Sequence, residues 1–455
     1  MRAARRAPAL SLALAMVLAA GGSVFGQSAS PSAPGAASGG GAVTLTIDQA
    51  INRAMSNQPL IQQAQAAVEA ARARVGEAES TYFPGVSASG SYNLIEPDQS
   101  FTFPMLGTFS LLPTNNWDFH LGLNQVIYQF GRRGAQVSLA RSGVSAALVG
   151  VDQIRMSLAY QTAVGFFTVL FMERQLAALD EQAQNLQEHL RATQVKADTG
   201  AATRYDELAT EVRVSALRSQ RIEADSQYDR QVLGLKQILG LKDSDTLVLS
   251  GDLRPPAGPS EDEDALVALA LSRRPDVRQA VQAESAAELS ARLAYLTAFP
   301  TISAHASAGY KNGLLPDINA MTFNWVAGVQ VNVPIFQGLL AVRTNDENQK
   351  KILAARENTL SVRRTATTQV IQALHDLQAS RRQVETAKAQ EDQARQMLEV
   401  VKLQYDLGML TNLEYLDAQA AMERAQVGSL QAGYREVVGE YALLQAAGAS
   451  IWKGD

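Results

Sequence analysis

The sequence predicts a mixed α/β membrane protein: a trimeric β-barrel of about 12 strands, four from each chain, continued by a long α-helical coiled-coil barrel. Three observations lead to this fold class. The chain contains two tandem repeats. Each repeat has two strand-like segments of alternating polarity, and each has a helical pattern far longer than a globular domain needs.

The N-terminus has the pattern of a secretory signal peptide at residues 1–26, with Arg2, Arg5 and Arg6 before an apolar run and small residues after it. Residues 27–42 are rich in Ser, Gly, Ala and Pro and predict a disordered leader. No later apolar run approaches the roughly 18–20 residues of a transmembrane helix. The formal charge of −5 and the absence of basic tracts argue against nucleic acid, and the absence of Cys excludes a lipid on an N-terminal Cys.

The internal repeat sets the domain organisation. Residues 58–92 resemble residues 274–310, and the same offset aligns Trp117 with Trp325 and the segment LKQILG with LLQAAG. The predicted boundaries are 43–240 for the first structural repeat, 241–261 for the inter-repeat linker, 262–449 for the second structural repeat and 450–455 for a C-terminal tail.

Each repeat is predicted to open with a helix. A capping box starts it, formed by Thr46 with Gln49 in the first repeat and by Ser260 with Glu263 in the second. The helix ends before the Phe-Pro pairs at 83–84 and 299–300, because a residue that precedes Pro resists the helical conformation.

Two strands of alternating polarity follow in each repeat. In the first repeat, the apolar side of the returning strand is Trp117, Phe119, Leu121 and Leu123, and Asp118, His120 and Asn124 lie opposite. In the second repeat, Trp325, Ala327, Val329 and Val331 repeat the apolar side. This period of two is typical of membrane β-barrel strands with one face to lipid and one to the lumen. An amphipathic strand of a soluble sandwich is the alternative.

Long helices come next, at about 134–199 and about 340–407, and each would extend roughly 100 Å at about 1.5 Å per residue. Apolar and small residues recur at heptad spacing in the first of them, which predicts coiled-coil packing. The chain then turns at Gly200 or Gly408 and returns as a shorter helix. The opening helix could stack end to end on this return helix and complete a second rod.

Four strands cannot close a barrel, and an open sheet edge in lipid leaves backbone groups without hydrogen bonds, at several kcal/mol each. Three chains would supply about 12 strands, an even number in the usual range. Rods of roughly 100 Å would cross a compartment much deeper than a bilayer. The expected location is therefore the outer membrane, with an extension into the periplasm.

The duplicated Pro…Phe-Pro-strand pattern and the G-x-x-T-x-x-[DE] tips at Gly200 and Gly408 resemble the TolC-type outer-membrane efflux proteins. The resemblance runs from LTIDQAINRAMSNQP to the final AAG, with Gln58 and Arg274 where that family often has Asn. It implies a homotrimeric, passive exit duct in outer-membrane lipid for a tripartite efflux or type I secretion system. The partners would be a periplasmic membrane-fusion adaptor and an inner-membrane pump of the RND or ABC type. The alternative function is that of a structural coiled-coil envelope or adhesin-like protein without a conduit.

Glu414 and Asp417 lie three residues apart and share one helix face just past the second tip. The resemblance implies that these positions form acidic rings at the periplasmic entrance, where repulsion between copies would raise the pKa values of the carboxyl groups and cations would be attracted. An ordinary solvated helix face, or acids that favour the start of a helix, is the alternative interpretation.

The resemblance also assigns Asp206 and Tyr405 to the hydrogen bonds and salt bridges that hold this entrance shut. The Arg expected two residues past the second tip is replaced by Leu410, and Arg204 and Lys402 are the candidate substitutes. Because Tyr405 occupies a heptad position, simple packing is an equal interpretation for it.

The tip residues Gly200, Thr203, Gly408 and Thr411 have a backbone explanation: Gly permits a left-handed turn and Thr can cap the returning helix. The resemblance adds contact with the adaptor. Trp117 and Trp325 are expected in a membrane belt or on the lipid face, and the loop 100–113 is unusually apolar.

No pattern points to catalysis, a cofactor or a metal. The four His residues, His120, His189, His305 and His375, are scattered without metal-ligand spacing, and phosphate-binding and nucleophile motifs are missing. We therefore expect a protein that is not an enzyme.

Overall fold

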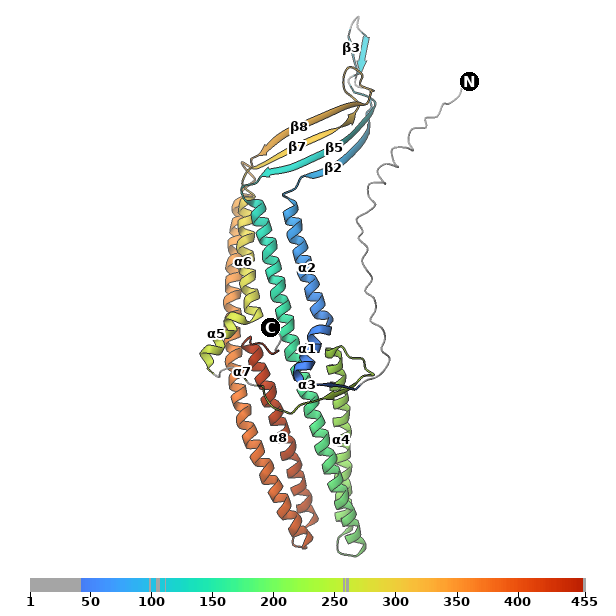
Figure 1. Cartoon of the computed structure of the whole chain (residues 1–455), viewed down its shortest axis with the longest axis vertical. Coiled ribbons are helices and arrows are strands. Elements are labelled where there is room, and N and C mark those ends of the chain that lie inside the picture. The colour runs from blue at the N-terminus through green and yellow to red at the C-terminus, as the bar shows by residue number, and fades with distance from the viewer. Residues whose placement is uncertain are drawn as a thin grey trace, which may run out of the picture. The chain divides into compact units, whose positions relative to one another are not determined.

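A computed structural model describes residues 42–97, 100–103, 107–110, 112–256, 258 and 262–452, and it combines long helices with a four-stranded sheet (Figure 1). The signal peptide and the leader up to residue 41 lie outside the described residues, as do Ser260 and residues 453–455.

The first half of the chain contains β1 (Ala42–Leu45), α1 (Ile47–Asn57), α2 (Pro59–Ser80), β2 (Gly85–Leu94), β3 (Ser100–Phe103), β4 (Gly107–Ser110), β5 (Asn115–Tyr128), α3 (Arg132–Asp198) and α4 (Arg204–Leu239). The second half contains β6 (Thr246–Leu249), α5 (Glu263–Arg273), α6 (Pro275–Leu296), β7 (Thr301–Lys311), β8 (Thr322–Asn332), α7 (Leu340–Asp406) and α8 (Asn412–Ala446). The predicted order of elements, with two long helices and two return helices, is confirmed.

The opening helix of each repeat is divided in two, which the sequence analysis did not predict. The break falls at Gln58 and at Arg274, each followed by a Pro at the first position of the next helix, where a missing N–H costs nothing. The capping box of Thr46 and Gln49 is confirmed. The second capping box was wrong, because α5 begins after Asp262 without a side-chain capping hydrogen bond.

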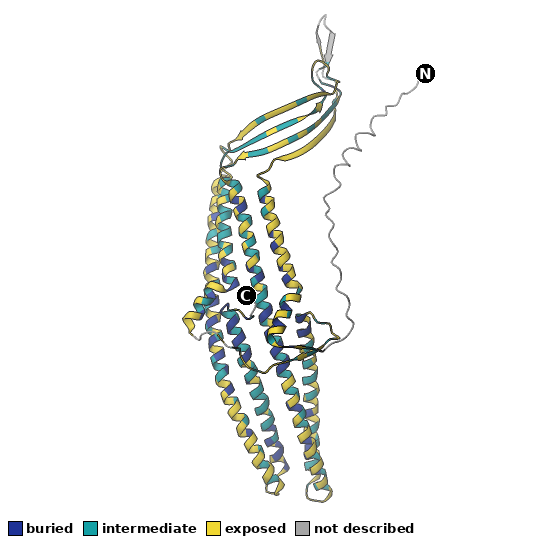
Figure 2. Ribbon diagram, in the orientation of Figure 1, coloured by how far each residue is buried: buried dark blue, intermediate teal, exposed yellow. Residues whose placement is uncertain are grey.

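The sheet has the order β2-β5-β7-β8 and is antiparallel throughout. Its register places Ala88, Leu121, Ala308 and Trp325 side by side, and the rows above and below them are apolar too. The other face carries Ser, Asn, His and Gln. Most residues of the apolar face are exposed in the single chain (Figure 2). The predicted alternation is therefore confirmed for all four strands.

Two short strand pairs were not predicted. β1 pairs in parallel with β6, which joins a segment assigned in part to the leader with the segment assigned to the linker. β3 and β4 form a hairpin within the apolar loop 100–113. Each of these strands has four residues, too few to show a periodic pattern.

The largest core cluster lies where α1, the middle of α3 and the ends of α4 and α8 meet, and Phe166, Ile51, Leu235, Leu239 and Val437 are almost fully buried in it. Ile451 and Trp452 of the predicted tail also pack there. Contrary to the sequence analysis, α3 is long and apolar enough to cross a membrane by length and composition. Because Phe166, Phe167 and Leu170 of α3 are buried in this cluster, we interpret α3 as a core helix.

Gln58 and Arg274 join the opening helices to the return helices. The Gln58 amide donates to the carbonyl oxygens of Gln237 (3.2 Å) and Ile238 (2.9 Å) in the last turn of α4. Arg274 donates to the carbonyl oxygen of Ala446 (3.1 Å) at the end of α8. Carbonyl groups in the last turn of a helix have no hydrogen-bond partner within that helix. Gln58 and Arg274, which precede α2 and α6, supply these partners at the ends of α4 and α8. The predicted end-to-end stacking is confirmed.

Candidate functional site at the hairpin tips

The two hairpin tips, formed by residues 199–203 and 407–411, are built alike. Gly200 (φ +77°) and Gly408 (φ +74°) adopt the left-handed conformation at the turns. Thr203 then caps α4 and Thr411 caps α8, each in a capping box. The structural part of the prediction for these residues is confirmed, and their contact with an adaptor stays a prediction.

The acidic residue of each capping box accepts hydrogen bonds from the Thr of its own tip. One oxygen of Glu414 accepts hydrogen bonds from the backbone N–H (2.8 Å) and the hydroxyl (2.8 Å) of Thr411. These bonds, the backbone one first, lower the pKa of Glu414 below its usual value. Asp206 makes the equivalent bonds to Thr203, at 3.0 Å and 2.7 Å. Within one chain, Glu414 is therefore a helix cap, and a rise of its pKa through repulsion between copies stays a prediction.

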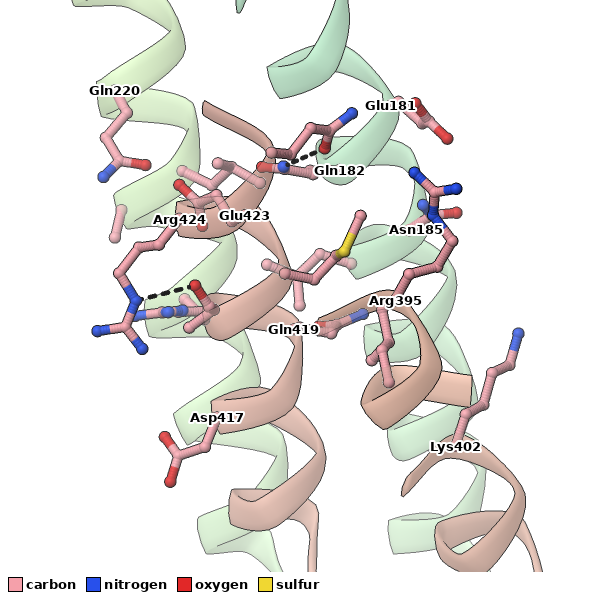
Figure 3. Close-up of a pocket in the computed structure, with 18 of the residues that line it drawn as sticks. Glu181, Gln182, Asn185, Gln220, Arg395, Lys402, Asp417, Gln419, Glu423 and Arg424 are labelled. Carbon is pink, nitrogen blue, oxygen red and sulfur yellow. Dashed lines mark hydrogen bonds between the residues drawn. The ribbon is translucent and has the colours of Figure 1, made fainter. Parts of the chain in front are cut away.

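Asp417 differs from Glu414 because its carboxylate is exposed and makes no hydrogen bond or ion pair with any residue that the structure describes. It lines a cavity of about 790 Å³ between the hairpins, together with polar and charged side chains of α3, α4, α7 and α8. In Figure 3, Asp417 points away from the labelled Gln182 and Gln419. Glu414 uses one carboxylate oxygen in the cap, whereas neither oxygen of Asp417 has a partner among the described residues, so Asp417 is the freer of the two to meet a cation or a second copy.

Tyr405 packs in an aromatic cluster near the tips. Its ring stacks on Tyr415 (5.2 Å between centroids) and lies 5.3 Å from His189, and the Lys196 ammonium is 4.2 Å from its centroid. Among the described residues, Tyr405 forms no hydrogen bond with Asp206. The packing interpretation of Tyr405 is thus confirmed for the single chain, and its part in a lock stays a prediction.

Two buried residues that the sequence analysis missed join the hairpins at this level. The Nε2 atom of His189 in α3 lies 2.7 Å from Oδ1 of Asn412, the first residue of α8. The Asn412 amide nitrogen donates to the carbonyl oxygen of Asp206 (3.1 Å) and to the hydroxyl of Thr210 (3.2 Å), both in α4. No repeat position signals this contact, because Asn412 aligns with Arg204 in the first repeat.

The candidate substitutes for the missing Arg at Leu410 are placed differently. Arg204 forms an ion pair with Glu207, three residues along its own helix. Lys402 is exposed on α7 and lines the cavity between the hairpins (Figure 3). Of the two, Lys402 alone is without an ion pair among the described residues.

Trp117 and Trp325 lie on the apolar face of the sheet, as predicted, although their place in a membrane belt is untested. The Trp117 ring contacts Tyr92 on β2 (4.4 Å between centroids) and stacks on Phe119 (6.0 Å), and Trp325 is 67% exposed. An exposed apolar face of this extent matches a lipid environment.

The sequence profile of the family described as outer membrane efflux protein matches residues 50–241 and 266–449. The chain belongs to this family. Its location is the outer membrane, with an extension into the periplasm.

Curated relatives cover most of the chain. Outer membrane efflux protein BepC of Brucella suis is 25% identical over 423 residues, which is 90% of this chain and 87% of BepC. The toluene efflux pump outer membrane protein TtgC of Pseudomonas putida is 25% identical over 425 residues, 90% of this chain and 84% of TtgC. The alkaline protease secretion protein AprF of Pseudomonas aeruginosa is 24% identical over 318 residues, 67% of this chain and 64% of AprF.

Solved structures have the same fold. The CmeC outer membrane channel of Campylobacter jejuni superposes with a TM-score of 0.76 at 20% identity, over 88% of this chain and 85% of CmeC. The outer membrane protein VceC of Vibrio cholerae gives a TM-score of 0.75 at 16% identity, over 89% of this chain and 96% of VceC. The predicted family and fold class are confirmed.

Proposed function

We propose that this protein is a passive exit duct in the outer membrane, assembled as a homotrimer and gated at its periplasmic tips. In each chain, the first structural repeat (43–240) and the second (262–449) follow a cleaved signal peptide (1–26). The duct has no catalytic activity, cofactor or metal of its own.

The observation that carries the proposal is the open four-stranded sheet with one apolar face. Among the strands that the structure describes, β2 and β8 are its edges, and each pairs with a neighbour on one side only. In lipid, every unpaired backbone group at such an edge costs several kcal/mol. Pairing β8 of one copy with β2 of the next satisfies these groups, and three copies give about 12 strands with the polar face inward.

The helical part supports a conduit that reaches far beyond the bilayer. α3 and α7 have 67 residues each, and helices of this length extend roughly 100 Å. Three copies of the two hairpins would form a hollow cylinder below the barrel. Its free end is the set of tips that carries Asp417, Glu414, Asp206 and Tyr405, where we place the gate.

We propose that the tips around Gly200, Thr203, Gly408 and Thr411 meet a periplasmic adaptor that links the duct to an inner-membrane pump of the RND or ABC type. The names of BepC and TtgC refer to efflux and that of AprF to secretion. Energy for transport comes from the pump, since the site offers polar walls and no reactive group.

Cross-linking of the sheet edges tests barrel closure. The chain has no Cys, so single Cys residues can be placed on the polar face of β2, at Ser87, Ser89 or Ser91, and of β8, at Asn324, Gln330 or Asn332. Oxidation of paired variants in isolated outer membranes should give a covalent trimer on a non-reducing gel, whereas single variants should not. If every paired variant still runs as a monomer on this gel, the result would contradict the duct and favour a coiled-coil spacer.

A further inference from the structure

Asn412 and His189 form a buried junction between the two hairpins of one chain. Asn412 is 5% exposed and His189 is 8% exposed. The hairpins touch through α8, which packs against α3 and α4, and the polar cavity opens between them next to this junction. Buried polar contacts therefore contribute to holding the second tip to the first, beside the apolar packing of Leu416 with Leu186 and Leu217.

The hydrogen bonds of Asn412 fix the tautomer of His189. The amide nitrogen of Asn412 donates to Asp206 and Thr210, so its oxygen is the acceptor that faces His189. Nε2 of His189 must then carry a proton, and in the neutral ring Nδ1 carries none. A second proton, on Nδ1, would place a cation inside the junction.

The surroundings of His189 disfavour that cation. Burial lowers the pKa of His189 and outweighs the hydrogen bond that Nε2 donates to Asn412, which raises the pKa. The ammonium of Lys196 on α3 lowers the pKa further, and the carboxylate of Asp406 on α7 opposes it. Tyr405 of α7 and Tyr415 of α8 present neutral rings. The groups of α4 at the junction are the Thr210 hydroxyl and the Asp206 backbone carbonyl, both uncharged. The Asp206 carboxylate accepts from Thr203 in the capping box instead.

We propose that His189 makes the contact between the two hairpin tips sensitive to acid, so that protonation of its imidazole loosens the tip end of the duct. An imidazole released into water takes up a proton near pH 6.5, whereas the buried one resists it. The junction is fully stable above this pH. As the pH falls below about 6.5, towards the lowered pKa of the buried imidazole, the junction loses stability. The reason is that His189 binds the proton readily when the two tips are apart and resists it when they are in contact. This inference rests on the proposed function only for its effect on transport.

Distances between spin labels on the two hairpins test the proposal in the full-length protein. Val212→Cys on α4 and Leu413→Cys on α8 place labels at exposed positions beside the junction. Labelled chains diluted with unlabelled ones report distances within a chain. The fraction of molecules with the longer label-to-label distance should grow as the pH falls from about 8 to about 5. The growth should reach at most about tenfold for each unit by which burial lowers the pKa of His189.

Two variants separate His189 from every other titrating group. H189Q keeps a side-chain amide that can donate to Asn412 but cannot titrate, and its label distances should not change over this pH range. N412D places a carboxylate beside Nε2, which favours the imidazolium, so acid should tighten the junction instead. An acid response in H189Q equal to that of the unsubstituted protein, or no response in either, overturns the proposal.

The same preparations distinguish a failure of this inference from a failure of the duct. If label distances respond to acid as expected but no conductance is found, the junction is acid-sensitive and the duct is wrong. If the protein conducts and the distances of H189Q and the unsubstituted protein respond alike, the duct stands and the role of His189 is wrong.

Discussion

Replacing Arg274 should loosen the joint between α6 and α8. The Arg274 side chain is 11% exposed, and its guanidinium contacts Asp276 (2.7 Å), the Gln369 side-chain oxygen (2.6 Å) and the Ala446 carbonyl (3.1 Å). Removing one partner of a buried ion pair costs about 3–5 kcal/mol. Asp276 is 37% exposed and keeps part of its hydration, so we expect about 2–3 kcal/mol for R274A.

Hydrogen exchange of the assembled protein measures this cost locally, without global unfolding. A loss of about 2–3 kcal/mol corresponds to exchange about 30- to 150-fold faster at the first amides of α6. The neighbouring Arg273 is exposed and is the matched control, since R273A should stay within about 0.5 kcal/mol of the unsubstituted protein. R274Q, which copies the residue of the first repeat, should fall between the two. Equal exchange rates in R274A and R273A would refute the capping role of Arg274.

Three further predictions concern the sheet, the turn and the gate. G309A should prevent assembly of the trimer, read on a native gel, because its Cβ would lie 1.9 Å from the Phe119 carbonyl oxygen. G408A should cost about 1–2 kcal/mol at the second tip, read as faster hydrogen exchange there, because the left-handed φ of +74° disfavours a side chain. D417N should enlarge conductance or weaken cation block more than E414Q, because one oxygen of Glu414 is already held by Thr411. Equal effects would contradict this difference.

Acid should weaken the joint at Arg274 as well. Burial raises the pKa of Asp276, but the hydrogen bond and charge of Arg274 and the backbone N–H of Val277 lower it below the usual value overall. The ionised Asp276 carboxylate therefore stabilises the joint above its ordinary pKa near 3.8, and this contribution is lost as the pH falls below that value. Hydrogen exchange at α6 should accelerate below about pH 4 in the unsubstituted protein but not further in R274A.

Most of the fold was predictable from the sequence because its patterns, the alternation along strands and the internal repeat, extend over many residues. The alternation around Trp117 and Trp325 gave the sheet faces, and the repeat of Gly200 at Gly408 gave the hairpins. Elements without a pattern were missed: the four-residue strands β1 and β6 depend on pairing with each other across the chain. The break at Gln58 was missed although Pro59 signals it, because the rule that a residue before Pro resists the helical conformation was applied only at 83–84 and 299–300.

The candidate site was less predictable, because its chemistry depends on three-dimensional contacts. Glu414 lies three residues after Thr411, at the spacing of a capping box, but it was interpreted together with Asp417 as one acidic pair. His189 was one of four scattered His residues, and its significance comes from Asn412, which is 223 positions away. The sequence cannot show that a polar residue at the start of α8 is buried against α3.

Single-channel recording from the purified protein in planar lipid bilayers tests the central claim most directly. The proposed trimeric duct should conduct ions, and D417N should change its conductance or its block by cations added on the side of the tips. A preparation shown to be folded and trimeric that gives no conductance, either unsubstituted or as D417N, would contradict the account.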